Sequence, residues 1–295
     1  MHSDNQQPAL SSWFILILLA LVWGTSYILI KYALKTFDPL QLASLRVCIA
    51  FLTLVPLLFI GQLKNFSGRQ WLPVALTGLL GSAIPALLFA IAQTRISSSL
   101  AAILNALVPL STLVTGALFF SQRMNRFKIA GVLLGITGTA GIILTRTNGT
   151  LATDNTFYSL LVILAGLCYA LQTNILKRYL GQASPLGITA WGFAFSGPMA
   201  ALIAVSSGVP EVIYSRPDAW KGVVYVSILG AFGTAAAIAL FSRLVQNTTP
   251  LFASTVTYLI PLVALLWGTL DGEIITLPDI AGLIAILAGI YLTSR

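Results

Sequence analysis

Two stretches of the chain place aromatic and basic side chains on one helix face. Trp23, Tyr27 and Lys31 are spaced four residues apart, so they lie one above another if this stretch is helical. Tyr169 and Lys177 repeat the arrangement two turns apart. Such a face suits the wall of a binding cavity for a small solute. The alternative for the aromatic residues is a belt at a membrane surface. For the lysines, which lie at the ends of the apolar stretches, we expect extension toward lipid headgroups.

Polar side chains inside apolar stretches supply the other candidate binding groups. Asn105 lies within a long apolar stretch, where an amide needs a partner or water, so we expect it to face the protein interior. Tyr258 occupies a comparable position in a later stretch. Hydrogen bonding between helices is the competing interpretation of both groups. The predicted substrate-binding residues are Trp23, Tyr27, Gln93, Asn105, Tyr169, Asn174 and Tyr258.

Arg46 is a basic residue about two turns inside another apolar stretch. Its side chain can extend outward to a membrane surface, hold one half of the protein in place, or bind a ligand. We expect a structural anchor, since a lone arginine near the end of an apolar stretch fits that role without any ligand.

The residues that most enzymes and metal sites need are missing from the apolar stretches. None of the eight acidic residues lies in the middle of such a stretch, and the single histidine is His2. Cys48 and Cys168 show no metal-ligand spacing. The sequence therefore predicts no catalytic residue, no metal and no cofactor, and it disfavours an enzyme. It also disfavours a proton relay built from acids or histidines within a membrane.

Composition identifies an integral membrane protein. Of 295 residues, 57% are hydrophobic and 8% are charged, and the mean hydropathy is +0.92. Soluble domains carry about 25% charged residues, which is enough to cover a globule with solvated surface. The net charge of +8 is explained by basic cytoplasmic loops, because no basic cluster with interleaved aromatics suggests a nucleic-acid partner.

The elements that position these residues are predicted to be ten transmembrane helices, since helices satisfy their own backbone groups in lipid. The distribution of Lys and Arg favours a multi-pass protein of the cell inner (plasma) membrane with both termini in the cytoplasm. The predicted spans are 12–34, 40–60, 71–93, 98–120, 127–145, 157–178, 185–207, 220–243, 250–269 and 277–294.

The two halves of the chain resemble each other. A shift of about 146 residues places Lys31 on Lys177, and a shift of about 152 places Pro109 on Pro261. We therefore predict two five-helix repeats, 1–148 and 149–295. Because five is odd, the repeats cross the membrane with opposite polarity, which is a construction plan of secondary transporters with a site between the halves. Pro109 and Pro261 are the predicted gating residues, where each helix could bend.

Three stretches carry a family resemblance: WGTSYILIK, GLLGSAIPALLFAIAQTRISSSLAAILNALVPLSTLVTG and the long run from ILGAFGTAAAIALF to IAGLIAILAG. They resemble EamA-type members of the drug/metabolite transporter superfamily. The resemblance implies ten helices in inverted repeats, and a central cavity lined by the first, third, fourth, sixth, eighth and ninth spans. It also implies small organic substrates such as amino acids. The family's loop glutamate matches Glu273, but Gln122 stands at the equivalent place in the first half.

The function predicted from these observations is secondary transport. We expect an exporter that moves a small neutral or zwitterionic metabolite, such as an amino acid, by alternating access of a central cavity. The expected partners are this solute and membrane lipid, with a monomer as the working unit. Two alternatives stay open: an efflux carrier for amphipathic drugs, and a non-transporting membrane assembly or receptor subunit.

Overall fold

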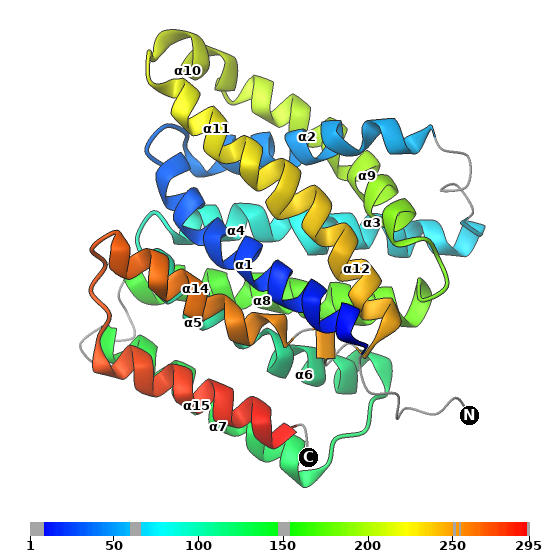
Figure 1. Cartoon of the computed structure of the whole chain (residues 1–295), viewed down its shortest axis with the longest axis vertical. Helices are drawn as coiled ribbons and strands as arrows, with labels where there is room; N and C mark the ends of the chain where they lie inside the picture. The colour runs from blue at the N-terminus through cyan, green and yellow to red at the C-terminus, as the bar shows by residue number, and fades with distance from the viewer. Residues whose placement is uncertain (1–8, 60–65, 147–153, 250–251, 254, 294–295) are drawn as a thin grey trace.

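The computed structural model describes residues 9–59, 66–146, 154–249, 252–253 and 255–293. Every regular element in these ranges is helical, as predicted (Figure 1). The helices are α1 (Leu10–Ala33), α2 (Pro39–Leu58), η2 (Gly68–Gln70), α3 (Trp71–Gly78), η3 (Leu79–Ala83), α4 (Ile84–Ala92), α5 (Ser98–Asn105), α6 (Val108–Phe120), α7 (Arg126–Arg146), α8 (Asp154–Tyr179), α9 (Pro185–Ser206), α10 (Val209–Ser215), α11 (Ala219–Gly230), η4 (Ala231–Ala236), α12 (Ala237–Asn247), α14 (Val256–Leu270) and α15 (Leu277–Thr293).

Eight helical stretches in the described part of the chain are long and apolar enough to cross a membrane. They coincide with the first eight predicted spans. The last two predicted spans correspond to α14 and α15, which are apolar but shorter, with 15 and 17 residues. The chain is therefore an all-helical membrane protein.

Capping residues fix where two of the helices begin, close to the predicted starts of their spans. The side chain of Asp38 accepts a hydrogen bond from the Gln41 backbone at 2.8 Å, and the Gln41 side chain accepts one from the Asp38 backbone at 3.1 Å. Ser184 accepts from the Gly187 backbone in the same way. The following prolines occupy the first helical turn, where no backbone donor is needed. A third predicted start, at Pro250, lies outside the described residues.

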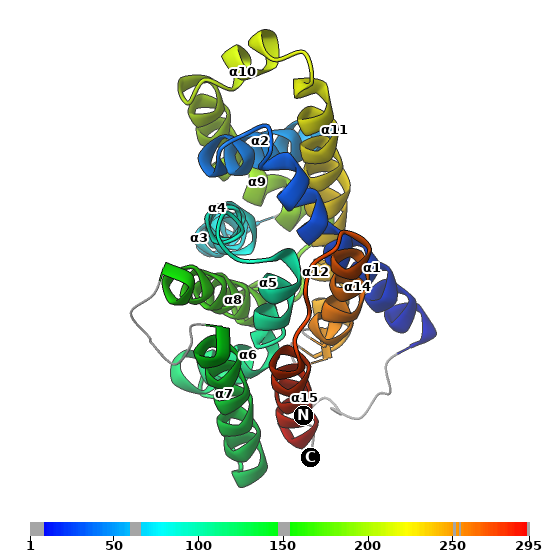
Figure 2. The ribbon, with the colours of Figure 1, turned by 90° about the vertical axis from the view of Figure 1, so that its left-hand side faces the viewer.

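Helices from the two predicted halves pair across the molecule. α7 packs on α15, α2 on α9, α1 on α14, and α6 on α8 (Figures 1 and 2). Glycines allow close contact between α7 and α15, and also between α3 and α9. A β-carbon at Gly131 would collide with the carbonyl oxygen of Gly289, and one at Gly78 would collide with that of Gly192. Small residues at helix crossings are typical of membrane proteins, because they let backbones approach.

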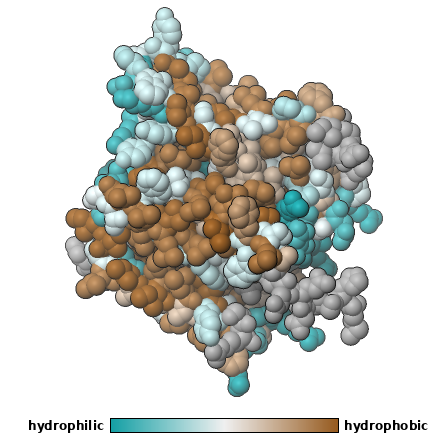
Figure 3. Space-filling model, in the orientation of Figure 1, coloured by the Kyte–Doolittle hydropathy of each residue, from teal (hydrophilic) through white to brown (hydrophobic). Residues whose placement is uncertain are grey.

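The outer surface carries large apolar side chains. Leu21, Phe119, Leu266 and Ile284 are each more than half exposed. Apolar residues cover the middle of the face in Figure 3, and polar residues gather toward its edges. This distribution suits contact with lipid acyl chains, since an apolar surface of this extent is costly in water.

Three of the membrane helices are irregular near their middle. The third and eighth spans each contain a π-helical segment, η3 and η4. The fourth span is divided between α5 and α6, and Pro109 lies in the first turn of α6. A bend at Pro109 was expected because a proline in a helix interior removes a backbone hydrogen-bond donor. That reason was wrong, since Pro109 lies in the first turn of α6, where a backbone N–H has no partner within the helix. Pro261 does lie inside its helix, α14.

Candidate functional site

A cavity lies at the centre of the helix bundle, next to these irregular segments. Residues of α1, α2, η3, α4, α5, α6, α8, η4, α12 and α14 line it. It encloses about 820 Å³ of space not occupied by atoms, part of which is open to solvent. Pockets for small molecules are typically lined mainly by apolar and aromatic side chains with a few polar groups, and this cavity has such a lining.

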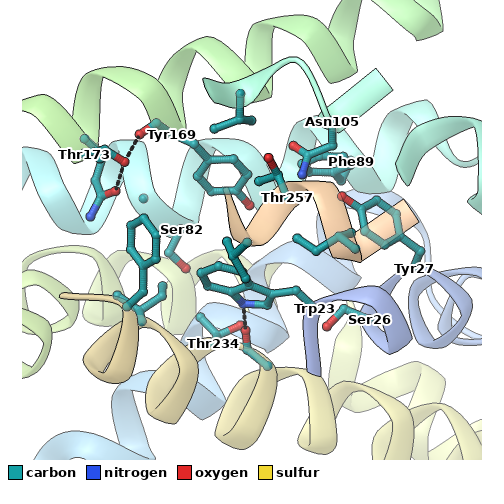
Figure 4. A pocket seen from close by; sticks show the side chains of 18 of the residues that line it. Trp23, Ser26, Tyr27, Ser82, Phe89, Asn105, Tyr169, Thr173, Thr234 and Thr257 are labelled. Carbon is teal, nitrogen blue, oxygen red and sulfur yellow. Dashed lines mark hydrogen bonds between the residues drawn. The ribbon is translucent and has the colours of Figure 1, made fainter. Parts of the chain in front are cut away.

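Four of the predicted binding residues line this cavity: Trp23, Tyr27, Asn105 and Tyr169 (Figure 4). Two aromatic contacts build one wall. Phe89 meets Tyr27 edge-on with ring centroids 5.6 Å apart, and it stacks on Tyr169 at 6.2 Å. Such contacts hold the rings in place and leave flat apolar surface for a solute.

The π-helical segment η4 orients the Trp23 ring. The indole Nε1 donates a hydrogen bond to the Gly233 carbonyl at 3.0 Å, drawn as a dashed line in Figure 4. A π-helical turn changes the usual hydrogen-bonding register and frees backbone groups, and such turns are frequent at functional sites. The indole ring of Trp23 also packs against the ring of Phe241, and the two ring centroids are 5.4 Å apart.

Two polar atoms that belong to cavity-lining residues have no hydrogen-bond partner in the structure. They are Oδ1 of Asn105 and Oγ of Ser82, and each residue is 4% exposed. An unpaired polar group inside a protein costs roughly 1–3 kcal/mol. Buried groups of this kind are candidates for contact with a bound molecule or with water.

Three predicted binding residues are not brought to the cavity. Asn174 hydrogen-bonds instead to the Thr112 carbonyl at 3.0 Å and to Oγ1 of Thr115 at 3.1 Å, joining α8 to α6. Gln93 is buried at the end of α4, and Tyr258 packs on the apolar core from α14. Neither of these two side chains lines the cavity.

Sequence reasoning missed several cavity residues. Thr257 lines the cavity, whereas its neighbour Tyr258 does not. The repeat held the necessary signal, because a shift of 152 residues places Asn105 on Thr257. Thr234 and Gln172 carried no comparable signal. Arg46 also lines the cavity and is 8% exposed, so its position allows ligand binding, a role that the sequence favoured less than that of a structural anchor.

At one end of the bundle, Lys31 forms ion pairs in place of the predicted extension toward headgroups. Its ammonium group lies 2.6 Å from Asp271 and 2.7 Å from Glu273, both in the loop after α14. Tyr32 also donates to Asp271. The prediction that Lys31 extends toward lipid headgroups was therefore wrong. The sequence could not reveal that the loop after α14 lies against α1.

Glu273 joins a third segment to this cluster. Its carboxylate accepts hydrogen bonds from the backbone N–H and hydroxyl groups of both Ser98 and Ser99, at the start of α5. Burial alone would raise the pKa of Glu273, but the hydrogen bonds from Lys31, Ser99 and Ser98 outweigh it and lower this pKa to about 2. The carboxylate therefore stays charged at physiological pH.

At the opposite end of the bundle, Lys177 and Gln122 bind neutral groups. Lys177 donates to the Thr248 carbonyl at 2.6 Å, just after α12. Gln122, the counterpart of Glu273, donates to Oδ1 of Asn174 at 3.0 Å. The two ends thus differ, because a carboxylate holds a lysine at one end and an amide binds an amide at the other.

No group of three or more His, Cys, Asp or Glu side chains in the described residues is placed to hold a metal ion. The cavity offers aromatic faces, hydroxyl and amide groups and one guanidinium. These groups are suited to binding a small organic molecule.

Comparison with known proteins places the chain among transporters. It is 28% identical to the "Uncharacterized inner membrane transporter YedA" of Escherichia coli K12, over 88% of this chain and 82% of that protein. It is 26% identical to the "Probable amino-acid metabolite efflux pump" of Salmonella typhimurium LT2, over 95% of this chain and 93% of the relative. An "Uncharacterized transporter" of Archaeoglobus fulgidus is 28% identical over 95% of this chain and 96% of its own length.

The fold is shared with a protein of known crystal structure. The two superpose with a TM-score of 0.64 at 18% identity, over 96% of both chains. The sequence model of the EamA-like transporter family matches residues 10–144 and 156–295, which together make up nearly all of the chain. The chain therefore belongs to the EamA-like transporter family.

Proposed function

We propose that this protein is a secondary transporter that exports a small neutral or zwitterionic metabolite, such as an amino acid, by alternating access of the central cavity. The observation that carries the proposal is the cavity itself, in which helices of both halves surround unpaired polar atoms with aromatic walls. The relative named as an amino-acid metabolite efflux pump supports this substrate class and the outward direction.

An inverted repeat of five plus five spans is part of this proposal. The family sequence model matches the two halves separately, over 10–144 and 156–295. The π-helical segments η3 and η4 fall in the third and eighth spans, which correspond to each other in the proposed repeat. The break between α5 and α6 supports a midplane site, since transporters form such sites from interrupted helices.

The two ends of the bundle are the proposed gates. The Lys31–Glu273 pair ties α1 to the loop after α14 and to the start of α5, so separation of these segments requires the pair to break. At the other end, a hydrogen bond from Gln122 to Asn174 links the loop after α6 to α8. Alternating access would open one set of contacts while the other stays closed.

Flux measurements on the purified full-length protein in proteoliposomes test this function. Saturable exchange of a labelled amino acid with unlabelled internal substrate is the expected result. An imposed pH gradient without a substrate gradient should produce no accumulation, because the described residues that line the cavity include no carboxylate or histidine, and Glu273 remains charged.

Three outcomes would contradict parts of the proposal. Accumulation that a protonophore abolishes would contradict uncoupled transport. Faster movement of amphipathic cationic dyes than of any amino acid would favour the drug-carrier alternative. If no member of a broad solute panel crosses the membrane, a non-transporting receptor or assembly role becomes the better explanation.

A further inference from the structure

Arg46 is a buried cation without a counter-charge. Its side chain reaches the cavity from the middle of α2, and its Nε donates a hydrogen bond to Oγ1 of Thr234 at 2.7 Å. The described residues offer its guanidinium no second hydrogen bond and no carboxylate at ion-pair distance. Because Arg46 and its partner Thr234 both line the cavity, the guanidinium lies beside the space that a solute would occupy.

The surroundings of Arg46 do not neutralise it. Among the described residues that line the cavity, none is Asp or Glu, and Arg46 is the only charged one. Tyr27 and Tyr169 are the titratable groups that act on it electrostatically. Phenols ordinarily titrate near pH 10, so both are neutral at working pH. A desolvated charge without a partner is costly, and an ionisable residue within a membrane usually has a functional role.

The second half of the chain has no equivalent cation. A shift of 146 residues places Arg46 on Gly192. Gly192 packs against Gly78, and a β-carbon at position 192 would lie 3.3 Å from backbone atoms of Gly78 and Val74, which is tighter than ordinary contact. The cavity therefore carries one positive charge on one side and none on the other, which suits a ligand with a single anionic group.

We propose that Arg46 is the carboxylate-binding residue of the cavity, and that the substrates are small carboxylates, with amino acids among them. This inference rests on the proposed transport function and adds the group that is recognised. A guanidinium matches a carboxylate through two parallel hydrogen bonds. A phosphate would bring more negative charge than one arginine balances. The unpaired Oδ1 of Asn105 is an acceptor for a substrate ammonium group, and the aromatic rings can contact the rest of the solute.

Paired ligands test this assignment on the wild-type protein. L-phenylalanine, L-leucine and L-threonine are compared with their carboxamides, which keep the side chain and the amine but lose the carboxylate. Thermal stabilisation and competition for flux in proteoliposomes are the two readouts. We expect the acids to bind roughly 10- to 100-fold more tightly than the amides, as the loss of a charge-assisted hydrogen bond implies.

Variants of Arg46 give an independent test. R46Q should lose the preference for acids over amides, and R46K should keep part of it because the charge remains. K128Q is the matched control, since Lys128 is a partly exposed cation at the start of α7, away from the cavity, and its loss removes the same charge. If R46Q does not fold, R46K and the acid–amide comparison on the wild type still decide the question.

The possible failures are distinguishable. If the wild-type protein transports solutes but binds each carboxamide as tightly as the matching amino acid, the role of Arg46 is overturned and the transport function still stands. R46Q with an unchanged preference for acids overturns it as well. Absence of flux for every solute, together with absence of binding, contradicts the proposed transport function itself.

Discussion

Lys31 and Glu273 are 242 positions apart in the chain, and their charged groups lie 2.7 Å apart at one end of the bundle. The contact joins the first membrane helix to the loop before the last one. Because Glu273 also accepts hydrogen bonds from Ser98 and Ser99, three segments meet at one carboxylate. The side chain of Glu273 is 5% exposed, so this pair is better shielded from water than ordinary surface pairs.

Replacement of this carboxylate should weaken closure at this end. Glu273→Gln removes the ion pair with Lys31 and weakens the hydrogen bonds to the start of α5, so we expect a loss of about 1–3 kcal/mol of stability. Accessibility of cysteines placed near this end should increase in parallel. Asp218→Asn is the control, because its pair with Lys221 is exposed to solvent and should contribute little. Equal effects of the two substitutions would argue against a gate.

The same carboxylate predicts how stability depends on pH. The pKa of Glu273 is lowered to about 2 from an ordinary value of 4.5, so the folded state favours the charged form. Its contribution is complete above pH 4.5 and is lost as the pH falls toward 2. Thermal unfolding from pH 7 to pH 3 should show a decline in the wild type that is smaller in Glu273→Gln. Identical slopes would show that other groups carry the acid sensitivity.

Two buried asparagines should separate binding from stability. Asn105→Leu removes an unpaired oxygen at the cavity, so we expect ligand affinity to fall about tenfold while stability without ligand does not fall, because this oxygen makes no hydrogen bond. Asn174→Leu breaks hydrogen bonds between α8 and α6 and should cost about 1–2 kcal/mol of stability. Thermal-shift measurements with and without an amino acid compare them. The reverse pattern would move the binding site away from Asn105.

Glycines of α7 provide a matched test of helix packing. Gly131→Ala places a methyl group against the Gly289 carbonyl of α15, and overpacking of this kind typically costs about 1–3 kcal/mol. Gly141→Ala, in the same helix, meets open space and should be neutral or slightly stabilising. Thermal unfolding in detergent measures both. A neutral Gly131→Ala would indicate that α7 and α15 do not pack closely in the membrane.

Much of the architecture was predictable from local signals in the sequence. Long apolar stretches locate the membrane helices because lipid permits little else, and Asp38 and Ser184 mark helix starts through the chemistry of capping. Mid-span polar and aromatic residues identified four cavity residues, Trp23, Tyr27, Asn105 and Tyr169. These signals lie within a few turns of chain, and so they need no knowledge of the tertiary fold.

The tertiary structure alone decided which of the similar side chains share a space. Asn105 and Asn174 are both amides within apolar helices, yet one faces the cavity and the other binds a neighbouring helix. The ion pair of Lys31 depends on a loop near the other end of the sequence. The sequence by itself determined a bundle of apolar helices, because burial and backbone hydrogen bonding act locally. Only the packing of these helices determined that Arg46 meets the cavity, because the direction of a side chain depends on how its helix is rotated against its neighbours.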